Sequence, residues 1–490
     1  MTLQPKEVRA PPLSPARFEE LLDAEAWAEF DGNLQQARRL FEDRVVWNVN
    51  STAKGGGVAE MLRSFTSYAR GAGLDMRWTV IEGTPEFFAA TKRIHNFLHG
   101  EAGDAGPLGS REREVYEAVT FANAEQFAVT VRPGDIVILH DPQTAGMATR
   151  LKHRGAVVIW RSHVGAEQPN ELVHHAWEFL APYLRDADAC VFSRHAYVPE
   201  WAATSVRTMV IQPSIDAFSP KNQDLDDAAV LAILGHVGLL GAGVPEGVTP
   251  TFTRYDGSPG RVDRLCEVLS TGPPPTADVP LVTQVSRWDR LKDPAGVMLG
   301  FAEHALDGTD AHLMLAGPNV TAVSDDPEGG EVLDEVVEQW RKLPQTERSR
   351  VHLSCLPMAD IDENAAIVNA LQRHSTIVVQ KSLEEGFGLT VAEAMWKSRP
   401  VVVSEVGGIK DQVIDGETGV LLEDARDLPT FGTAVRALLD DPAQRERLGR
   451  NAREHVRQHF LINRHARQYL ELLGAVLAQH GALADAGAPS

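Results

Sequence analysis

The chain has 490 residues, which is more than one compact core usually holds and enough for two domains of ordinary size. Hydrophobic residues make up 43% of the sequence and charged residues 23%, an ordinary balance for a globular protein. Acidic residues (68) outnumber basic ones (47), and the resulting formal charge of −21 argues against broad contact with nucleic acid or with an anionic membrane.

The cysteines and the distribution of apolar residues indicate the cellular compartment of the protein. Cys190, Cys266 and Cys355 are far apart in the sequence and form no CxxC pair, so they indicate neither a disulfide framework nor a zinc site. Residues 1 to about 15 are polar and proline-rich, without an apolar signal segment, and no apolar run has the length of a membrane span. The sequence therefore predicts a soluble, cytoplasmic protein.

The first half of the chain alternates between helices and buried strands. A helical segment at residues 16–43 precedes a first apolar strand at 44–50, and further strands are predicted at 77–81, 135–139, 156–160, 189–192 and 208–211. Helical stretches lie between most of these strands, which indicates a parallel sheet covered on both faces.

A triple-glycine turn, Gly55–Gly57, follows the first strand and opens a helix. It is not a GxGxxG motif, because Glu60 stands where the third glycine would fall, and it lacks the ending of a P-loop. A tight turn without a ligand is one interpretation. Three consecutive glycines are costly to order, however, so close approach of a ligand is favoured.

Several later strands of this half end in polar side chains. The segments are His140–Gln143, Arg161–His163 and Ser193–His195. In open α/β sheets the ligand crevice lies beyond the carboxyl ends of the strands. One such histidine alone is more often structural than catalytic, but three polar clusters at successive strand ends favour a shared cleft.

A second alternating series starts with an apolar strand at residues 280–285 and continues with strands at 312–317, 351–353, 376–379 and 400–404. Arg287 and Lys292 directly follow the first of these strands. They are either two solvated loop cations or a pair that converges on one anion, for which arginine offers a planar fork and lysine a point charge.

The strand at 376–379 leads into a glycine turn and then a helix that begins at about Leu389. Free backbone N–H groups and the helix dipole favour a phosphate at such a junction. Glu385 in the turn and Glu393 in the helix can hold sugar hydroxyls beside that anion. Alternatively, Glu393 only complements the helix dipole and Glu385 is a solvated loop charge.

The domain boundaries follow from composition. Residues 224–278 are rich in Gly, Pro, Asp and Thr, which predicts a helical segment, an irregular excursion and then a linker. We therefore predict an N-terminal domain at 1–275 that includes this excursion and a C-terminal domain at 276–458. A helix at 459–480 is expected to pack back on the first domain, and the tail at 481–490 is expected to be disordered.

Two doubly wound domains, a basic pair after a strand of the second, and two glutamates separated by seven residues form a specific combination. In this combination the sequence resembles the retaining glycosyltransferases of family 4, over residues 45 to about 472. The resemblance becomes closer to the glycosyltransferring trehalose synthases and the related trehalose phosphorylases at residues 47–52, 55–60, 80–83, 140–143, 160–163, 213–216, 219–222 and 393–397. It implies the α/β fold named GT-B, in which two Rossmann-like domains face each other across a cleft and a C-terminal helix crosses back to the first domain.

The resemblance also implies roles for residues of the second domain. Arg287 and Lys292 would bind the donor diphosphate, and Glu393 would hold the nucleotide ribose. Glu385 and the turn that follows it would hold the donor sugar and its phosphate, through Gly386, Phe387, Gly388 and Leu389. In the first domain, the loop with Gly56 and Gly57 would close over the donor, His163 would face the donor sugar, and the acceptor would lie near Asp141, Gln143 and Arg161.

The implied activity is that of a retaining hexosyltransferase that moves glucose from UDP-, ADP- or GDP-glucose to a sugar acceptor. Glucose is the expected acceptor and trehalose the expected product, in a reversible reaction. The predicted catalytic residues are Arg287, Lys292, Glu385 and His163. The sequence presents no obvious covalent nucleophile, so front-face attack is favoured, in which the enzyme contributes positioning and anion stabilisation.

No cofactor or metal is expected, because Arg287 and Lys292 take the place of a metal and because Asp325 and Asp326 are interpreted as part of a surface turn. The expected partners are sugars and nucleotide sugars, with neither nucleic acid nor membrane, and a homodimer is compatible with the sequence.

Three other functions compete with this one. They are a trehalose phosphorylase that uses inorganic phosphate and α-glucose 1-phosphate, a non-catalytic nucleotide-sugar binding protein, and a dehydrogenase-like protein, which the lack of GxGxxG disfavours. Two departures from the family bear on the donor and the acceptor. Asp293 stands where the family commonly has glycine, and the region 224–278 is longer than in compact members.

Overall fold

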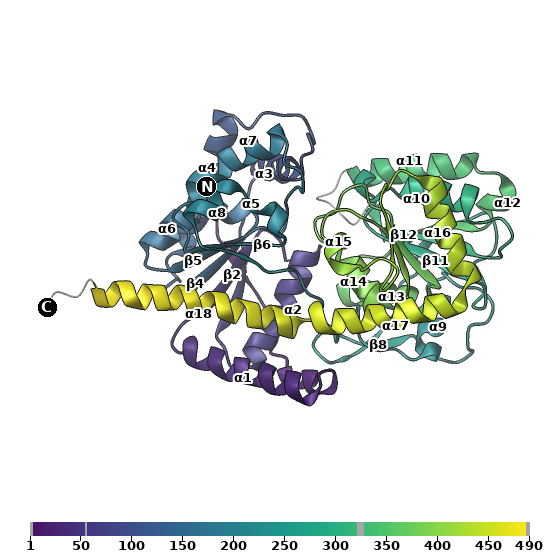
Figure 1. The fold of residues 1–490 in the computed structure, drawn as a ribbon, viewed down its shortest axis with the longest axis horizontal. Coiled ribbons are helices and arrows are strands. Elements are labelled where there is room, and N and C mark those ends of the chain that lie inside the picture. Colours follow the sequence, from purple (N-terminus) through teal and green to yellow (C-terminus); the bar gives the residue numbers. More distant parts are fainter. Residues whose placement is uncertain (1–2, 54–55, 321–327, 487–490) are drawn as a thin grey trace. The chain divides into compact units, whose positions relative to one another are not determined.

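The computed structural model describes residues 3–53, 56–320 and 328–486, and Figure 1 shows its elements. The chain divides into two compact units. The first comprises Met1–Ser214 together with Ile462–Ser490, and the second comprises Ile215–Leu461. Among the described residues, no helix is long and apolar enough to cross a membrane.

The described part of the first unit contains a seven-stranded sheet in the order β1-β3-β2-β4-β5-β6-β7. Strand β1 at the edge is antiparallel to β3, and the other pairs are parallel. The strands are β1 (Lys6–Val8), β2 (Val46–Asn50), β3 (Met76–Val80), β4 (Ile136–His140), β5 (Val157–Arg161), β6 (Ala189–Phe192) and β7 (Thr208–Val210). The central strands are rich in valine and isoleucine and buried along their whole length, as expected for a parallel sheet covered on both faces.

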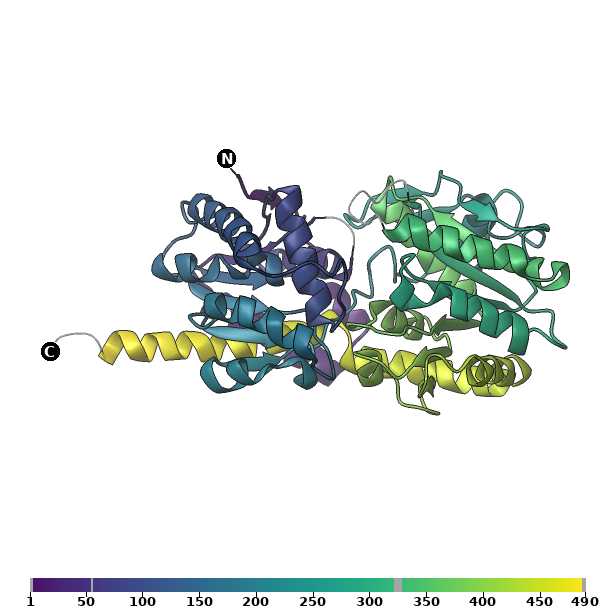
Figure 2. The same cartoon turned by 90° about the horizontal axis from the view of Figure 1, so that it is seen from above.

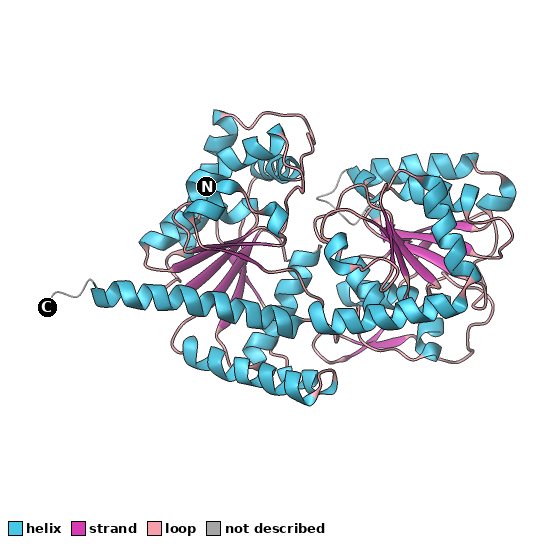
Figure 3. Cartoon of the chain, viewed as in Figure 1, coloured by secondary structure: helices cyan, strands magenta, loops and turns pink. Residues whose placement is uncertain are grey.

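Helices lie on both faces of this sheet (Figure 3). They are α1 (Ala24–Leu40), α2 (Gly57–Gly71), α3 (Pro85–Leu98), α4 (Ser110–Phe127), α5 (Pro142–Ala145), α6 (Ala148–His153), α7 (Glu171–Leu184), α8 (Glu200–Ser205) and α18 (Ile462–Ala486), with short 3-10 helices at Pro15–Glu20 and His195–Tyr197. The helical segment predicted at 16–43 is divided, because the Asp23 carboxylate accepts the Ala26 N–H and begins α1 there.

The last helix, α18, joins the first unit although it comes from the opposite end of the chain, and Figure 2 shows it beside that unit's sheet. The Arg464 guanidinium donates to the carbonyl oxygens of Gln212 (3.0 Å) and Pro213 (2.9 Å). The helix continues to Ala486, past residue 481, where we expected a disordered tail to begin. Alanine and leucine dominate this stretch and favour a helix. Residues 487–490 lie outside the described part.

The second unit repeats the same architecture. Its described residues form a seven-stranded sheet in the order β10-β13-β12-β11-β14-β15-β16, in which only the edge strand β10 is antiparallel to its neighbour. The strands are β10 (Glu267–Leu269), β11 (Leu281–Val285), β12 (His312–Pro318), β13 (Val351–Leu356), β14 (Ile377–Gln380), β15 (Val401–Ser404) and β16 (Val420–Leu422), and a separate hairpin pairs β8 (Thr251–Thr253) with β9 (Pro259–Arg261).

The helices of the second unit pack on both faces of its sheet. They are α9 (Asp227–His236), α10 (Pro294–His304), α11 (Glu328–Lys342), α12 (Gln345–Arg348), α13 (Ile361–His374), α14 (Leu389–Trp396), α15 (Ile409–Gln412), α16 (Leu428–Asp440) and α17 (Pro442–His459), with a 3-10 turn at Arg290–Lys292. One core lies between the sheet and α10, α11 and α16, and another between the sheet and α9 and α13.

The irregular region at 224–278 belongs to the second unit, which begins at Ile215, whereas we predicted a boundary near residue 275. Three contacts explain the difference. Helix α9 packs against α13 in one core, β10 extends the second sheet by pairing with β13, and the buried Glu363 carboxylate accepts the N–H groups of Asp263 (2.7 Å) and Arg264 (2.6 Å). The irregular composition of this region concealed two elements of the second fold.

Candidate active site

The predicted site residues of the second unit follow two neighbouring strands. Strands β11 and β14 are parallel and adjacent, with Thr283 opposite Val378, so the loops after them emerge at the same edge of the sheet. The first loop is tied back to its own strand, because the Gln284 side chain donates to the Lys292 carbonyl oxygen (2.7 Å).

Lys292 and Glu385, which come from these two loops, form an ion pair. The Lys292 Nζ atom lies 2.7 Å from Glu385 Oε2, and their side chains are only 16% and 13% exposed. The Ser382 hydroxyl donates to the same carboxylate oxygen (3.4 Å). The structure thus brings together two residues for which we predicted separate contacts, one with the diphosphate and one with the sugar.

Arg287 lies in the same loop and is more open. Its side chain is 51% exposed, and its guanidinium is 3.3 Å from the Asp289 carboxylate. Arg290, which was not predicted to take part, pairs with Glu328 (3.0 Å) and Glu335 (2.5 Å) of α11. Arg287 therefore pairs with a carboxylate of its own loop, whereas Arg290 pairs with carboxylates of α11.

Asp293, which stands where the family commonly has glycine, occupies a left-handed backbone conformation with φ 48°. Glycine adopts this region without strain, and aspartate tolerates it better than most residues. One carboxylate oxygen caps α10 by accepting the Gly296 N–H (3.0 Å), and the other pairs with the fully buried Lys381. The Lys381 ammonium also donates to the Ala425 carbonyl oxygen (2.6 Å). The acid beside the predicted diphosphate site is therefore neutralised within the protein.

The glycine turn that precedes α14 is held by a second glycine turn. Gly388 has φ 82° and begins α14. A Cβ atom on Gly408 would lie 2.6 Å from the Phe387 Cα atom, so only glycine allows this approach. The Gln412 amide donates to the carbonyl oxygens of Phe387 and Gly408. Neither Gly408 nor Gln412 was assigned a role from the sequence, although two adjacent glycines at 407–408 are a sequence signal for such a close approach.

Glu393 lies on α14 with a side chain only 6% exposed. Its carboxylate is 3.7 Å from Lys221 Nζ. One helical turn further, the buried Lys397 ammonium donates to the Glu393 carbonyl oxygen (3.1 Å), Asn222 Oδ1 (2.9 Å) and Gln372 Oε1 (2.8 Å). Burial lowers the pKa of Lys397 well below its usual value, and the charge of Glu393 opposes that shift.

In the first unit, the ends of β4 and β5 bring His140 and His163 together. His140 Nδ1 lies 3.1 Å from His163 Nε2, and the two rings are stacked with an interplanar angle of 15°. The Asp141 carboxylate accepts the backbone N–H of His163 (2.8 Å). Burial raises the pKa of Asp141 to about 7, although the hydrogen bond from His163 and the charge of Arg161 act against the rise.

The side chain of Arg161 is fully buried and directed into the unit. Its guanidinium donates to the Tyr469 hydroxyl (2.7 Å), to the Ile211 carbonyl oxygen (3.2 Å) and to His163 Nδ1 (3.4 Å). We predicted a contact between Arg161 and the acceptor, whereas these bonds tie β5 to α18. Gln143 lies on α5, and its buried Oε1 atom has no hydrogen-bond partner among the described residues.

The glycine loop of the first unit is described only in part. Gly56 has φ 80° and precedes α2, and Gly57 is the first residue of that helix, whereas Gly55 lies outside the described residues. Asp325 and Asp326 lie outside them as well. Within the described residues, no group of three or more His, Cys, Asp or Glu side chains is arranged to hold a metal ion.

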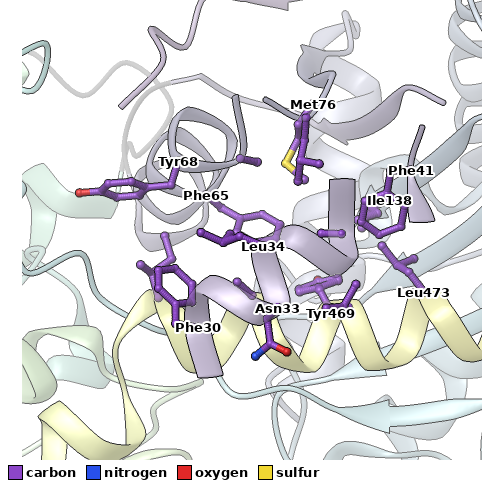
Figure 4. Close-up of a pocket in the computed structure, with 16 residues that line it drawn as sticks. Phe30, Asn33, Leu34, Phe41, Phe65, Tyr68, Met76, Ile138, Tyr469 and Leu473 are labelled. Atoms are coloured by element: carbon purple, nitrogen blue, oxygen red, sulfur yellow. The ribbon is translucent and has the colours of Figure 1, made fainter. Parts of the chain in front are cut away.

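An apolar pocket of the first unit is distinct from these groups. It is enclosed by α1, α2 and α18 and lined by side chains such as Phe30, Phe65, Met76, Ile138 and Leu473 (Figure 4). None of the predicted site residues lines it. The candidate site is therefore defined by the polar groups at the strand ends and not by this pocket.

Residues 48–199 match the family model described as the N-terminal domain of trehalose synthase, and residues 274–455 match the model of group 1 glycosyl transferases. The chain is 33% identical over 438 residues to the trehalose synthase of Thermococcus litoralis, which covers 89% of this chain and 91% of that protein. The chain belongs to the trehalose synthase family. It is also 33% identical over 461 residues to the trehalose synthase of Rubrobacter xylanophilus, with 92% and 94% covered.

The chain is also similar to a more distant relative and, in its fold, to a solved structure. A trehalose phosphorylase of Pleurotus sajor-caju is 26% identical over 402 residues, which cover 76% of this chain and 50% of that protein. The trehalose-phosphate synthase structure from Burkholderia vietnamiensis superposes with a TM-score of 0.65 at 14% identity and covers 89% of this chain and 99% of its own. The predicted GT-B fold is confirmed, and the chain is a glycosyltransferase of the trehalose-related group.

Proposed function

We propose that the protein transfers glucose, with retention of the anomeric configuration, from a nucleotide-glucose to glucose and so forms trehalose. The observation that carries this proposal is the Lys292–Glu385 ion pair beside the N-terminus of α14. It combines a cation suited to a leaving phosphate with a carboxylate suited to sugar hydroxyls, and the helix N-terminus adds partial positive charge. Membership of the trehalose synthase family supports the choice of product.

In the proposed reaction, Arg287 and Lys292 bind the donor diphosphate and Glu385 binds the donor sugar. The bond between the anomeric carbon and the diphosphate oxygen breaks as the acceptor oxygen approaches the same face. The acceptor hydroxyl passes its proton to the departing phosphate oxygen. Negative charge grows on the diphosphate, where Lys292 and the first N–H groups of α14 stabilise it. Glu393 is assigned to the nucleotide ribose.

The proposal assigns charge neutralisation at the diphosphate to protein cations and includes no metal or cofactor. Because Arg287 is half exposed, it can turn toward an incoming diphosphate at small cost, whereas Lys292 is already held in place by Glu385. The glycosyltransferase is placed in the cytoplasm, where the three free cysteines stay reduced.

A phosphorylase is the second candidate, and the similarity to the Pleurotus sajor-caju protein favours it. In that reaction inorganic phosphate takes the place of the nucleotide diphosphate at Arg287 and Lys292. The ribose contact assigned to Glu393 then has no counterpart.

One experiment separates these functions. The purified protein is incubated with glucose and, in parallel, with UDP-, ADP- or GDP-glucose or with α-glucose 1-phosphate. Formation of trehalose and an equal amount of nucleoside diphosphate supports the synthase. Trehalose and inorganic phosphate from α-glucose 1-phosphate alone indicate the phosphorylase. Tight nucleotide-glucose binding with no disaccharide from any donor rejects both in favour of a binding protein.

A further inference from the structure

A series of hydrogen-bonded polar side chains connects the middle of β2 with the end of β4, the end of β5 and the loop after β5 in the first unit. Arg161 Nε donates to His163 Nδ1 (3.4 Å), His163 Nε2 lies 3.1 Å from His140 Nδ1, and His140 Nε2 lies 3.0 Å from Asn48 Oδ1. Asn48, His140 and Arg161 are buried, whereas His163 is partly exposed. Of these four residues, His163 is therefore the one that the reacting sugars can reach.

The chemistry of Arg161 determines which atom donates and which accepts in each of these hydrogen bonds. A guanidinium can only donate, so His163 Nδ1 must accept and carry no proton. A neutral His163 then carries its proton on Nε2 and donates it to His140 Nδ1. His140 in turn carries its proton on Nε2 and donates to Asn48 Oδ1. All three contacts are satisfied by two neutral imidazoles that share one tautomer.

The surroundings favour this neutral state. Burial, followed by the charge of Arg161, holds the pKa of His140 well below its usual value. The same two causes hold the pKa of His163 down, and the neighbouring His140 and His465 add to them.

We propose that Asn48 and His140 are positioning residues, which keep His163 neutral, in one tautomer and in one orientation toward the reacting sugar. This inference rests on the proposed function and on the expectation, implied by the family resemblance, that His163 faces the donor sugar. Neither Asn48 nor His140 was assigned a role from the sequence, although both lie in segments that resemble the family.

The neutral state of His163 matters because positive charge develops at the anomeric carbon as the donor's diphosphate leaves. An imidazolium beside that carbon would repel it, whereas a neutral ring does not. Orientation matters because transfer depends on the placement of donor and acceptor within fractions of an ångström. This series of hydrogen bonds is anchored at one end by Asn48 on β2 and at the other by the bond between Arg161 and Tyr469 of α18.

Asn48 offers a nearly isosteric test, because its Nδ2 atom has no hydrogen-bond partner among the described residues. Asn48→Asp therefore removes no donated hydrogen bond but places a carboxylate against His140 Nε2. The carboxylate favours an imidazolium at His140, and a ring protonated on both nitrogens can no longer accept from His163.

The first measurement is ¹⁵N NMR of histidine ring nitrogens in the full chain near neutral pH. We expect a protonated Nε2 and an unprotonated Nδ1 for both His140 and His163, and protonation of both His140 nitrogens in Asn48→Asp. A proton on Nδ1 of His163 in the wild type would overturn the inference. These spectra need no turnover, so they test the tautomer separately from the proposed function.

The second measurement is the steady-state kinetics of His140→Phe. A matched control exists in the second unit, where His352 is equally buried and lies 2.8 Å from His312, with the two rings stacked at 5°. We expect kcat to fall about tenfold or more in His140→Phe, with the donor KM little changed, and to stay near the wild-type value in His352→Phe. Equal kcat values in the two variants would overturn the positioning role.

Discussion

Lys292 and Glu385 are 93 residues apart in the sequence, yet their charged groups lie 2.7 Å from each other at the carboxyl ends of two adjacent strands. The pair places a cation and a carboxylate beside the N-terminus of α14 before any donor is bound. Such an arrangement is preorganised for a ligand that carries both phosphate and hydroxyl groups. It links the two sequence motifs of the second unit into one site.

The first prediction concerns Lys292. Lys292→Met removes the cation from the leaving group and leaves the largely buried Glu385 carboxylate without its ammonium partner. We expect kcat to fall by roughly two to three decades, which corresponds to about 3–4 kcal/mol of transition-state stabilisation. Arg290→Met is the control, because Arg290 is a cation of the same loop that pairs with α11 and not with Glu385. Near-normal turnover of Lys292→Met would remove this lysine from the reaction.

The second prediction separates the two glutamates. Glu393→Gln should weaken nucleoside diphosphate binding, measured by calorimetry, because Glu393 is assigned to the ribose. Glu385→Gln should lower kcat with a smaller effect on nucleotide binding, because Glu385 is assigned to the sugar. If Glu393→Gln binds the nucleotide as the wild type does, the ribose assignment is wrong and the phosphorylase gains support.

The third prediction concerns the buried ion pair of Asp293 and Lys381. Asp293→Gly suits the left-handed backbone but removes the α10 cap and leaves the Lys381 ammonium buried without a carboxylate. We expect the second unit to lose about 3–5 kcal/mol of unfolding free energy, measured with urea. The double variant Asp293→Gly with Lys381→Met should recover part of that loss. A single variant as stable as the wild type would contradict the pairing.

The fourth prediction concerns pH. The pKa of Asp141 is raised to about 7, so the folded protein binds this proton more tightly than the unfolded chain does. The contribution of Asp141 to stability therefore falls as pH rises from about 4 to about 7 and is constant above that range. In the variant Asp141→Asn, the amide oxygen accepts the His163 N–H without carrying a charge. Asp141→Asn should thus gain stability over the wild type by at most a few kcal/mol at pH 8, and much less at pH 4.

Urea unfolding of both proteins across this pH range checks the fourth prediction. The difference between them isolates Asp141 from the buried histidines, which both proteins share. A difference that is the same at pH 4 and pH 8 would show that Asp141 is an ordinary carboxylate.

The fold could be predicted from local patterns. Apolar runs such as Val401–Ser404 and the glycine turns after them are short-range signals, and they correctly indicated two predominantly parallel sheets, but not their antiparallel edge strands. The domain boundary could not be predicted in this way, because α9 and β10 are fixed by contacts with α13 and β13, which lie about a hundred residues away.

The candidate site, likewise, could be predicted from local patterns only in part. The residue types of Arg287, Lys292 and Glu385 indicated anion and sugar binding, but no local pattern shows that Lys292 pairs with Glu385. Lys381 follows a strand and gave no signal of its ion pair with Asp293. The bond from Arg161 to Tyr469 joins residues more than 300 positions apart, so the inward direction of this arginine could be found only in the structure.

Above all, we propose that the protein joins the glucose of a nucleotide-glucose to glucose with retention. ¹H NMR of the reaction mixture, recorded during the first turnovers, tests it most directly because it shows the configuration of the new bond before any equilibration. We expect the first disaccharide to be α,α-trehalose, formed in step with free nucleoside diphosphate. A β-linked disaccharide, or release of glucose without any disaccharide, would contradict it.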